Sequence, residues 1–197
     1  MEFRILSRNM TETDPSTGIM TFFNQAPNLS RQKEGLSMSI ASVRSYLEQF
    51  GIADRILEFP VSSATVELAA QAAGVIPARI AKSLSFKVNG KAILIVTAGD
   101  AKVDNRKFKD FFHTKATMLS PEEAVTLIGH AVGGVCPFGV KEDVDVYLDV
   151  SMRRFETVFP AAGSANSAIE LTCDQLERCA CNCRGWGDFC KGWQESA

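Results

Sequence analysis

A β-hairpin near the middle of the chain is the sequence feature that most constrains the fold. Residues 80–88, IAKSLSFKV, are typical of a strand, and residues 92–97, AILIVT, are apolar at nearly every position. Asn89–Gly90, between the two runs, favours a two-residue hairpin turn. Because the second strand would be apolar on both faces, we expect it to lie inside a sheet that is covered on both sides.

Helical patterns and short strand-like runs surround this hairpin. Helices are expected at 39–50, 65–73, after Asp104, over 120–129 and from Thr172 onward, with strands at 56–59, 144–150, 156–159 and 168–171. Ser120 and Thr172 each begin a capping box, and Gly74 is placed to end the second helix. The sum predicts one mixed α/β domain, with a central mixed, largely antiparallel sheet surrounded by helices.

The first 37 residues differ from the rest of the chain. They are rich in Ser, Thr and Asn and lack a sustained hydrophobic period. We interpret residues 1–37 as an N-terminal extension, disordered or loosely docked, and residues 38–197 as the domain. A chain of 197 residues suffices for one well-packed domain and is short for two.

Composition narrows the possible partners. The chain is 46% hydrophobic and 22% charged, with a formal net charge of −2, so any nucleic-acid contact requires a local basic patch. No run is long enough to cross a bilayer, and the first residues lack the pattern of a secretory signal. We therefore expect a cytoplasmic protein with reduced cysteines, and neither DNA nor a membrane as its partner.

Lys82 is the residue that fits its surroundings least. In an extended strand it shares a face with Ile80, Leu84 and Phe86, which is an apolar row. One interpretation is a lysine whose stem packs in the core while its amine reaches water. The other is an amine held at the rim of a pocket, where it could bind a carbonyl, a phosphate or a ribose hydroxyl and where burial would lower its pKa.

The segment GHAVGGVCPFGV, residues 129–140, predicts a shaped loop. Gly133 and Gly134 would let the backbone approach a ligand, and their N–H groups could form a small cradle for an anion or carbonyl. An ordinary turn is the alternative. Cys136 suggests a nucleophile, but we expect none, because no Cys–His–carboxylate set is evident and His130 more simply ends the preceding helix.

Small residues are concentrated in a second loop, PAAGSANSAIEL, at 160–171. Gly163 suggests backbone packed closely against a neighbour, and Ser164 and Asn166 could bind a substrate. A tight turn leading into the next strand is an equally good interpretation.

A basic helix face is expected after Asp104. Arg106, Lys109 and His113 are three and four residues apart, so they share one side of the helix. This face could contact a phosphate backbone, or it could be simply solvated.

Four cysteines lie near the C-terminus, Cys179, Cys181, Cys183 and Cys190. Cys-x-Cys-x-Cys is not zinc-finger spacing and no histidine lies near. We expect thiols that pack, with no metal and no cofactor; a metal site is the alternative.

Taken in order, several segments resemble the YbaK/EbsC family of aminoacyl-tRNA deacylases, which includes free-standing relatives of the prolyl-tRNA synthetase editing domain. The resembling segments are SSATVELAAQAAGV, IAKSLSF, VTAGDAKVD, GGVCPFGV, VYLD, AAGSANSAIEL and WGDFCK. They span nearly all of residues 38–193. The resemblance implies hydrolysis of the ester that joins a wrong amino acid to the terminal ribose of a tRNA.

The resemblance also implies roles for individual residues. Lys82 occupies the position of the family's functional lysine, and with the backbone of Gly133 and Gly134 it would position the ester and stabilise the oxyanion. Neither a serine nor a cysteine nucleophile is implied. Substrate-binding positions would be Thr65, Ser83, Pro137, Asp149, Gly163, Ser164 and Asn166, and tRNA-backbone positions Arg106 and Lys109.

One departure from the family pattern bears on the substrate. The cysteine-specific branch carries a serine and an aspartate where this chain has Ala161 and Ala168. The sequence is more similar to branches that remove small amino acids, so we expect alanine or serine wrongly attached to proline tRNA, with aminoacyl-tRNA and a synthetase as partners. The alternative is a catalytically silent module of the same fold that binds a tRNA or a synthetase.

Overall fold

The predicted hairpin forms the centre of the structure, a computed structural model that describes residues 40–193. The expected extension at 1–37 lies outside these described residues. Strand β2 (Ile80–Val88) pairs along its length with β3 (Lys91–Ala98), and Asn89 and Gly90 both have positive φ, as the predicted two-residue turn requires. Leu94, Ile95 and Val96 are completely buried, which confirms that β3 is covered on both faces.

Six strands form the main sheet, in the order β8–β6–β2–β3–β5–β9. The other four are β5 (Asp145–Asp149), β6 (Thr157–Pro160), β8 (Leu171–Thr172) and β9 (Cys183–Gly187). The β8–β6 and β2–β3 pairs are antiparallel, whereas β6–β2, β3–β5 and β5–β9 are parallel. The mixed sheet is confirmed, and its parallel part exceeds the expectation because long crossover segments precede β5 and β9.

Two further antiparallel pairs lie beside the main sheet. They are β1 (Ile56–Glu58) with β7 (Ser167–Ile169), and β4 (Lys102–Val103) with β10 (Cys190–Lys191). The strand predicted at 168–171 is therefore divided into β7 and β8, which have different partners.

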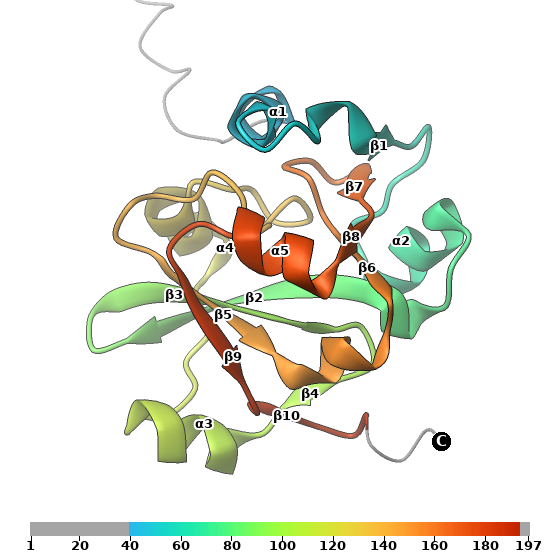
Figure 1. Cartoon of the computed structure of the whole chain (residues 1–197). Helices are drawn as coiled ribbons and strands as arrows, with labels where there is room; N and C mark the ends of the chain where they lie inside the picture. The colour runs from blue at the N-terminus through green and yellow to red at the C-terminus, as the bar shows by residue number, and fades with distance from the viewer. Residues whose placement is uncertain (1–39, 194–197) are drawn as a thin grey trace, which may run out of the picture. The chain divides into compact units, whose positions relative to one another are not determined.

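Helices pack on both sides of the sheet. They are α1 (Ile40–Glu48), α2 (Val66–Ala73), α3 (Asn105–Phe112), α4 (Pro121–Glu123) and α5 (Cys173–Cys179), with α4 continuing as a π-helical turn over Ala124–Ile128. Short 3-10 turns occupy Ala53–Arg55, Pro77–Arg79 and Val150–Arg154. Figure 1 shows α4 and α5 on one side of the sheet and α3 on the other. The predicted capping boxes at Ser120 and Thr172 are confirmed.

The aromatic side chains of α3 divide between the core and the surface. Phe108 and Phe112 are buried and Phe108 packs against Phe86 of β2, but Phe111 is 54% exposed. Two of the three phenylalanines of α3 therefore belong to the core. Successive residues in a helix are 100° apart, so Phe111 and Phe112 cannot both point at the sheet.

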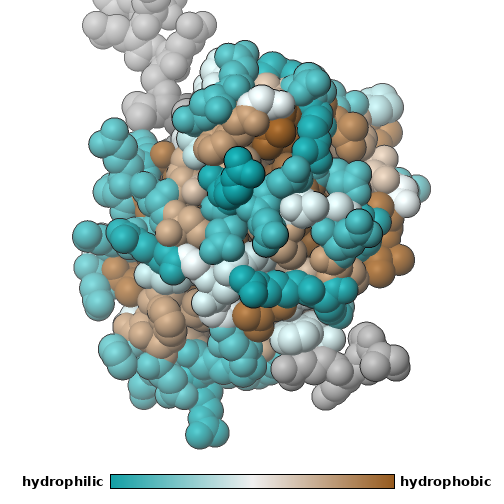
Figure 2. All heavy atoms as spheres, viewed as in Figure 1, coloured by the Kyte–Doolittle hydropathy of each residue, from teal (hydrophilic) through white to brown (hydrophobic). Residues whose placement is uncertain are grey.

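Figure 2 shows that the viewed face is mostly hydrophilic, with apolar surface gathered at the side where α2 lies. Val61, Leu68 and Ile76, in and around α2, are among the exposed large apolar side chains. No helix in residues 40–193 is long and apolar enough to span a bilayer.

Candidate active site

The candidate site is a cavity of about 370 Å³ at a gap in the sheet. Strand β6 pairs with β2 only at Ile80 and Ala81. Farther along the same edge, Lys87 N–H donates to the Thr117 carbonyl and Leu119 N–H donates to the Ser85 carbonyl. Between these two partners, residues 82–84 of β2 have β3 on one edge but no strand on the other edge in the part of the chain that the structure describes. The cavity occupies this opening.

The backbone of Ser83 faces the opening. In an antiparallel strand, alternate residues direct their N–H and C=O groups to the same side. Ser85 and Lys87 bond the segment at 117–119, so Ser83 directs its backbone groups to that side as well. The Ser83 hydroxyl is also buried and has no hydrogen-bond partner among residues 40–193. A ligand in this cavity would therefore meet a free donor and acceptor from the backbone and a free hydroxyl.

Lys82 is half-buried, and its ammonium group is held by backbone carbonyls. Nζ donates to Gly99 O at 2.9 Å and to Ala101 O at 2.5 Å. Burial lowers the pKa of Lys82, and the nearby Cys190, Asp100 and Glu67 oppose that shift. The amine is thus neither a free surface group nor a fully buried one. Because an ammonium has three N–H bonds, one donor is left for a ligand.

Gly99 is required for this arrangement, because the chain passes very close to Pro77 there. A Cβ at Gly99 would lie 2.0 Å from the Pro77 carbonyl oxygen and 2.7 Å from a methyl group of Val66. A side chain at position 99 would therefore displace the backbone that carries one of the two Lys82 acceptors.

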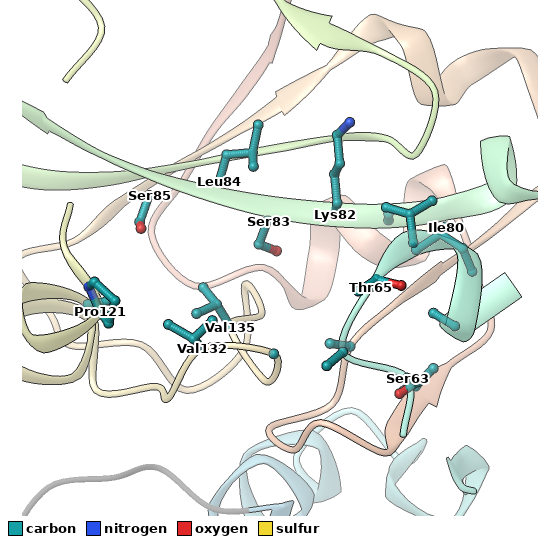
Figure 3. A pocket seen from close by; sticks show the side chains of 18 of the residues that line it. Ser63, Thr65, Ile80, Lys82, Ser83, Leu84, Ser85, Pro121, Val132 and Val135 are labelled. Atoms are coloured by element: carbon teal, nitrogen blue, oxygen red, sulfur yellow. The ribbon is translucent and has the colours of Figure 1, made fainter. Parts of the chain in front are cut away.

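Lys82 and Ser83 lie on opposite faces of β2. In Figure 3, Lys82 and Leu84 point to one side of the strand, and Ser83 and Ser85 point to the other, toward Val132 and Val135. All of them line the cavity. This is possible because the cavity opens at the strand's edge, where side chains from both faces are accessible.

The two glycines expected to form the cradle have different surroundings. Gly133 lines the cavity, and its N–H has no hydrogen-bond partner among residues 40–193. Gly134 is buried, and its N–H donates to Ala131 O at 3.0 Å. A Cβ at Gly134 would lie 2.9 Å from Gly163 C and from Ser164 N. The available donor is Gly133, whereas Gly134 is occupied with packing against the second loop.

Ser164 and Asn166, in that second loop, bond within the protein. The Ser164 hydroxyl bonds Asn166 and Ser167, and the Asn166 amide donates to the Phe59 carbonyl. Gly163, Ser164 and Asn166 do not line the cavity. The turn that they form lies against the Gly133–Gly134 loop, and their contact with a substrate stays a prediction.

Two further positions expected to bind substrate also lie away from the cavity walls. Asp149 is completely buried, and its carboxylate accepts the N–H of Ser151 at 3.0 Å and of Phe189 at 2.8 Å. Pro137 is buried, and its carbonyl accepts the Cys181 N–H. Thr65, by contrast, lines the cavity, although its hydroxyl caps α2 by accepting the Leu68 N–H.

His130 and Cys136 are brought together below the glycine loop, which the sequence did not indicate. Both are completely buried, and His130 Nδ1 lies 3.1 Å from the Cys136 amide nitrogen and 3.5 Å from its Sγ. Burial lowers the pKa of His130 to about 4 and raises the pKa of Cys136 to about 12. Both shifts disfavour a thiolate–imidazolium pair, and the expectation that Cys136 is not a nucleophile stays a prediction.

Arg106 and Lys109 line a separate hollow of about 560 Å³, together with Asn105, Asp110, Lys115 and Ala116. Three cationic side chains face one carboxylate there. The hollow and the cavity are close along the chain, since Ala116 lines the first and Met118 the second.

The four C-terminal cysteines lie on different elements. Helix α5 ends at Cys179, Cys183 begins β9 and Cys190 begins β10. Within residues 40–193, no three Cys, His, Asp or Glu side chains are grouped so that they could hold a metal ion.

With this geometry described, comparison with known proteins identifies the family. The model of the aminoacyl-tRNA editing domain matches residues 61–179, which include every cavity-lining residue. This chain belongs to the aminoacyl-tRNA editing domain family. The match ends before β9 and β10.

Similar proteins agree with this assignment. The chain is 54% identical over 158 residues to YwhH of Bacillus subtilis, an uncharacterized protein, covering 80% of this chain and all of YwhH. It is 33% identical over 86 residues to the proline–tRNA ligase of the same organism, of which the match spans 15%. A solved structure described as that of a proposed trans-editing enzyme for prolyl tRNA synthetase has a TM-score of 0.71 and 30% identity, covering 80% of this chain and 99% of that one.

Several features of the site carried no signal in the sequence. The acceptors of Lys82 are backbone carbonyls, and the opening at residues 82–84 depends on where β6 and the 117–119 segment end. Ala161 and Ala168, singled out as departures from the family pattern, do line the cavity and form an antiparallel bridge with each other.

Proposed function

We propose that this protein is a trans-editing hydrolase of the cytoplasm that removes alanine or serine from mischarged proline tRNA. The observation that carries the proposal is the cavity at the open edge of β2, which places Lys82, Ser83 and Gly133 around one space in a chain of the editing-domain family. A cavity of this size is within the usual range for small-molecule sites.

In this proposal, the aminoacyl ester lies along the open edge of β2. The free N–H of Gly133 and the remaining N–H of the Lys82 ammonium stabilise the negative charge that develops on the carbonyl oxygen of the ester. Water adds to the ester carbon, and the ribose oxygen leaves with a proton. The described residues that line the cavity include no Asp, Glu or His, and the Lys82 ammonium has no lone pair, so activation of the water falls to the neighbouring ribose hydroxyl of the substrate.

The alanines and the unpartnered serine hydroxyl support the choice of amino acid. Ala161 and Ala168 form a wall of small side chains, and Ser83 offers an unused hydroxyl. A small residue such as alanine fits such a wall, and serine would also engage the hydroxyl. A substrate side chain that is longer by one methylene group is expected to be disfavoured only modestly, by about 1–3 kcal/mol.

The same proposal assigns the basic hollow to the tRNA. Arg106, Lys109 and Lys115 would contact phosphates next to the acceptor end, because the 115–118 segment joins the hollow to the cavity rim. Replacing Arg106 and Lys109 together with alanine should raise KM and leave kcat unchanged. Synthetase binding, through which a small editing protein could gain tRNA specificity, is a further part of the proposal.

The decisive experiment is deacylation of proline tRNA charged with alanine, serine, cysteine, threonine or proline. We expect release of alanine or serine, and a loss of at least about 100-fold in kcat/KM for Lys82→Ala, since one oxyanion donor contributes that much. Lys87→Ala is the matched control, because Lys87 is an exposed lysine on the same strand. Equal activity of Lys82→Ala and the wild type would contradict the assigned role of Lys82.

The second candidate function is a catalytically silent module that binds a tRNA or a synthetase. The observation that favours it is the engagement of the Lys82 ammonium by two carbonyls, which leaves little freedom to the amine. Tight binding of charged tRNA without release of any of the five amino acids would establish this function instead.

A further inference from the structure

His130 stands out among the buried polar groups because it contributes nothing to the cavity lining and is still fully enclosed. It lies directly after Gly129, which ends the π-helical turn in a left-handed conformation. Six residues later the chain returns to it at Cys136. The residues between them include three cavity-lining positions, Val132, Gly133 and Val135.

The hydrogen bond to Cys136 fixes the protonation of His130. A backbone N–H can only donate, so Nδ1 must be the acceptor and must carry no proton. In the neutral ring, the proton is then on Nε2, which is buried with no hydrogen-bond partner in residues 40–193. A buried N–H without an acceptor lowers the stability of the folded protein. The presence of this ring therefore indicates that its bond at Nδ1, or a water bound at Nε2, offsets that loss.

We propose that His130 is a positioning residue that closes the 131–135 loop and so sets the place of the Gly133 N–H. The imidazole ties together the two ends of the loop, while the internal bond from Gly134 N–H to Ala131 O shapes its middle. The turn at 163–164 presses on Gly134 from outside. Three contacts therefore determine where the Gly133 N–H points. The role of His130 in turnover rests on the proposed function.

Protonation of His130 would break the tie, because an imidazolium has no acceptor. Desolvation lowers the pKa of His130, and no charged side chain of residues 40–193 opposes or assists that shift. Among these residues, the titratable group that faces the ring is the Cys136 thiol. The thiol itself lies 3.8 Å from the Phe138 carbonyl. The loop should therefore keep its closed form at all pH values well above 4.

The test compares His130→Asn with His130→Leu. The two replacements have similar shapes, but the asparagine carbonyl can accept the Cys136 N–H near the place of Nδ1, and leucine cannot. We expect kcat within about threefold of wild type for His130→Asn, and a fall of about 10- to 100-fold for His130→Leu. In hydrogen exchange, the Cys136 amide should be protected in the wild type and in His130→Asn, and exposed in His130→Leu. Should His130→Leu not fold, His130→Gln, whose amide lies one bond farther out, replaces it.

Cys136→Ala separates positioning from chemistry. It retains the backbone N–H that His130 accepts, so we expect nearly unchanged kcat. If the two single variants Cys136→Ala and His130→Asn both lost activity, the result would overturn the proposal in favour of a thiol–imidazole function. Equal exchange rates of the Cys136 amide in all variants would also overturn it. The exchange measurement needs no substrate, so it decides the role of His130 in the loop even if the wild type deacylates nothing, an outcome that would refute the proposed function alone.

Discussion

The Asp149 carboxylate on β5 and the Ser83 hydroxyl on β2 are buried polar groups of one sheet, and they differ in their hydrogen bonding. The Asp149 carboxylate, at the end of β5, accepts two backbone N–H groups. The Ser83 hydroxyl, at the open edge of β2, has no partner in residues 40–193. Buried polar groups that are fully bonded hold a fold together, whereas an unbonded group beside a cavity indicates a place for a ligand. The comparison therefore separates stability from function within one sheet.

The largest effect on stability is expected at the satisfied position. Asp149→Ala would leave the Ser151 and Phe189 N–H groups buried without acceptors, so we expect a loss of about 4 kcal/mol in the free energy of unfolding. Urea denaturation measures it. Asp143→Ala, at an exposed carboxylate, is the control and should change stability by less than about 0.5 kcal/mol. A small effect at Asp149 would undo the comparison.

Acid should weaken the structure through His130, a second buried group of the site. Its pKa is lowered from 6.5 to about 4 in the folded protein, so between these pH values the unfolded chain binds more protons. Stability is then fully present above pH 6.5 and is lost as the pH falls toward 4, by about 3 kcal/mol in all. His130→Asn cannot titrate, so the stability difference between it and the wild type should change over this window, and a constant difference would exclude the effect.

An intermediate effect is expected at the contact between the two loops. In Gly134→Ala, the added methyl group would lie 2.9 Å from Gly163 C and Ser164 N, which is too close for a van der Waals contact. We expect a loss of about 1–3 kcal/mol in stability and a larger relative loss of activity, since the Gly133 N–H would move. Thermal unfolding and deacylation of the same preparations compare the two, and unchanged activity would show that the loops are independent.

The smallest effect on stability belongs to the unsatisfied position. Ser83→Ala removes a hydroxyl that bonds nothing in residues 40–193, so the free energy of unfolding should stay within about 0.5 kcal/mol of wild type. Release of serine should fall about tenfold if the hydroxyl binds substrate, which corresponds to about 1.4 kcal/mol. If Ser83→Ala lost stability but kept full activity, Ser83 would be a structural residue like Asp149.

The parts of the fold that could be predicted are those specified by short runs of adjacent residues. The Asn89–Gly90 turn, the helix that follows Asp104 and the capping boxes at Ser120 and Thr172 are specified by a few adjacent residues, and all are confirmed. Strands β9 and β10 were missed. Their sequence, CRGWGDFCK, contains two glycines and little alternation, and they are held by pairing with β5 and β4, which are distant in sequence.

The part of the candidate site that could be predicted is a side chain that does not match its apolar neighbours. The part that could not be predicted is the set of hydrogen bonds made by main-chain groups. Lys82 was found because a charged residue interrupts an apolar row. Its acceptors at Gly99 and Ala101 are carbonyls, which every residue has. Asp149 was expected to bind substrate from the resemblance alone, and its fixed partners are main-chain groups of Ser151 and Phe189, which no side-chain pattern identifies.

The pairing of β4 with β10 bears on when the site can form during synthesis. The carbonyls that hold Lys82 lie immediately before β4, and β10 is supplied by Cys190 and Lys191. The N–H of the neighbouring Phe189 donates a hydrogen bond to the Asp149 carboxylate. A nascent chain that has emerged from the ribosome only through α5 would contain every cavity-lining residue but not the strand that braces them. The pocket should therefore be complete only after Cys190 and Lys191 have been synthesised and have paired with β4.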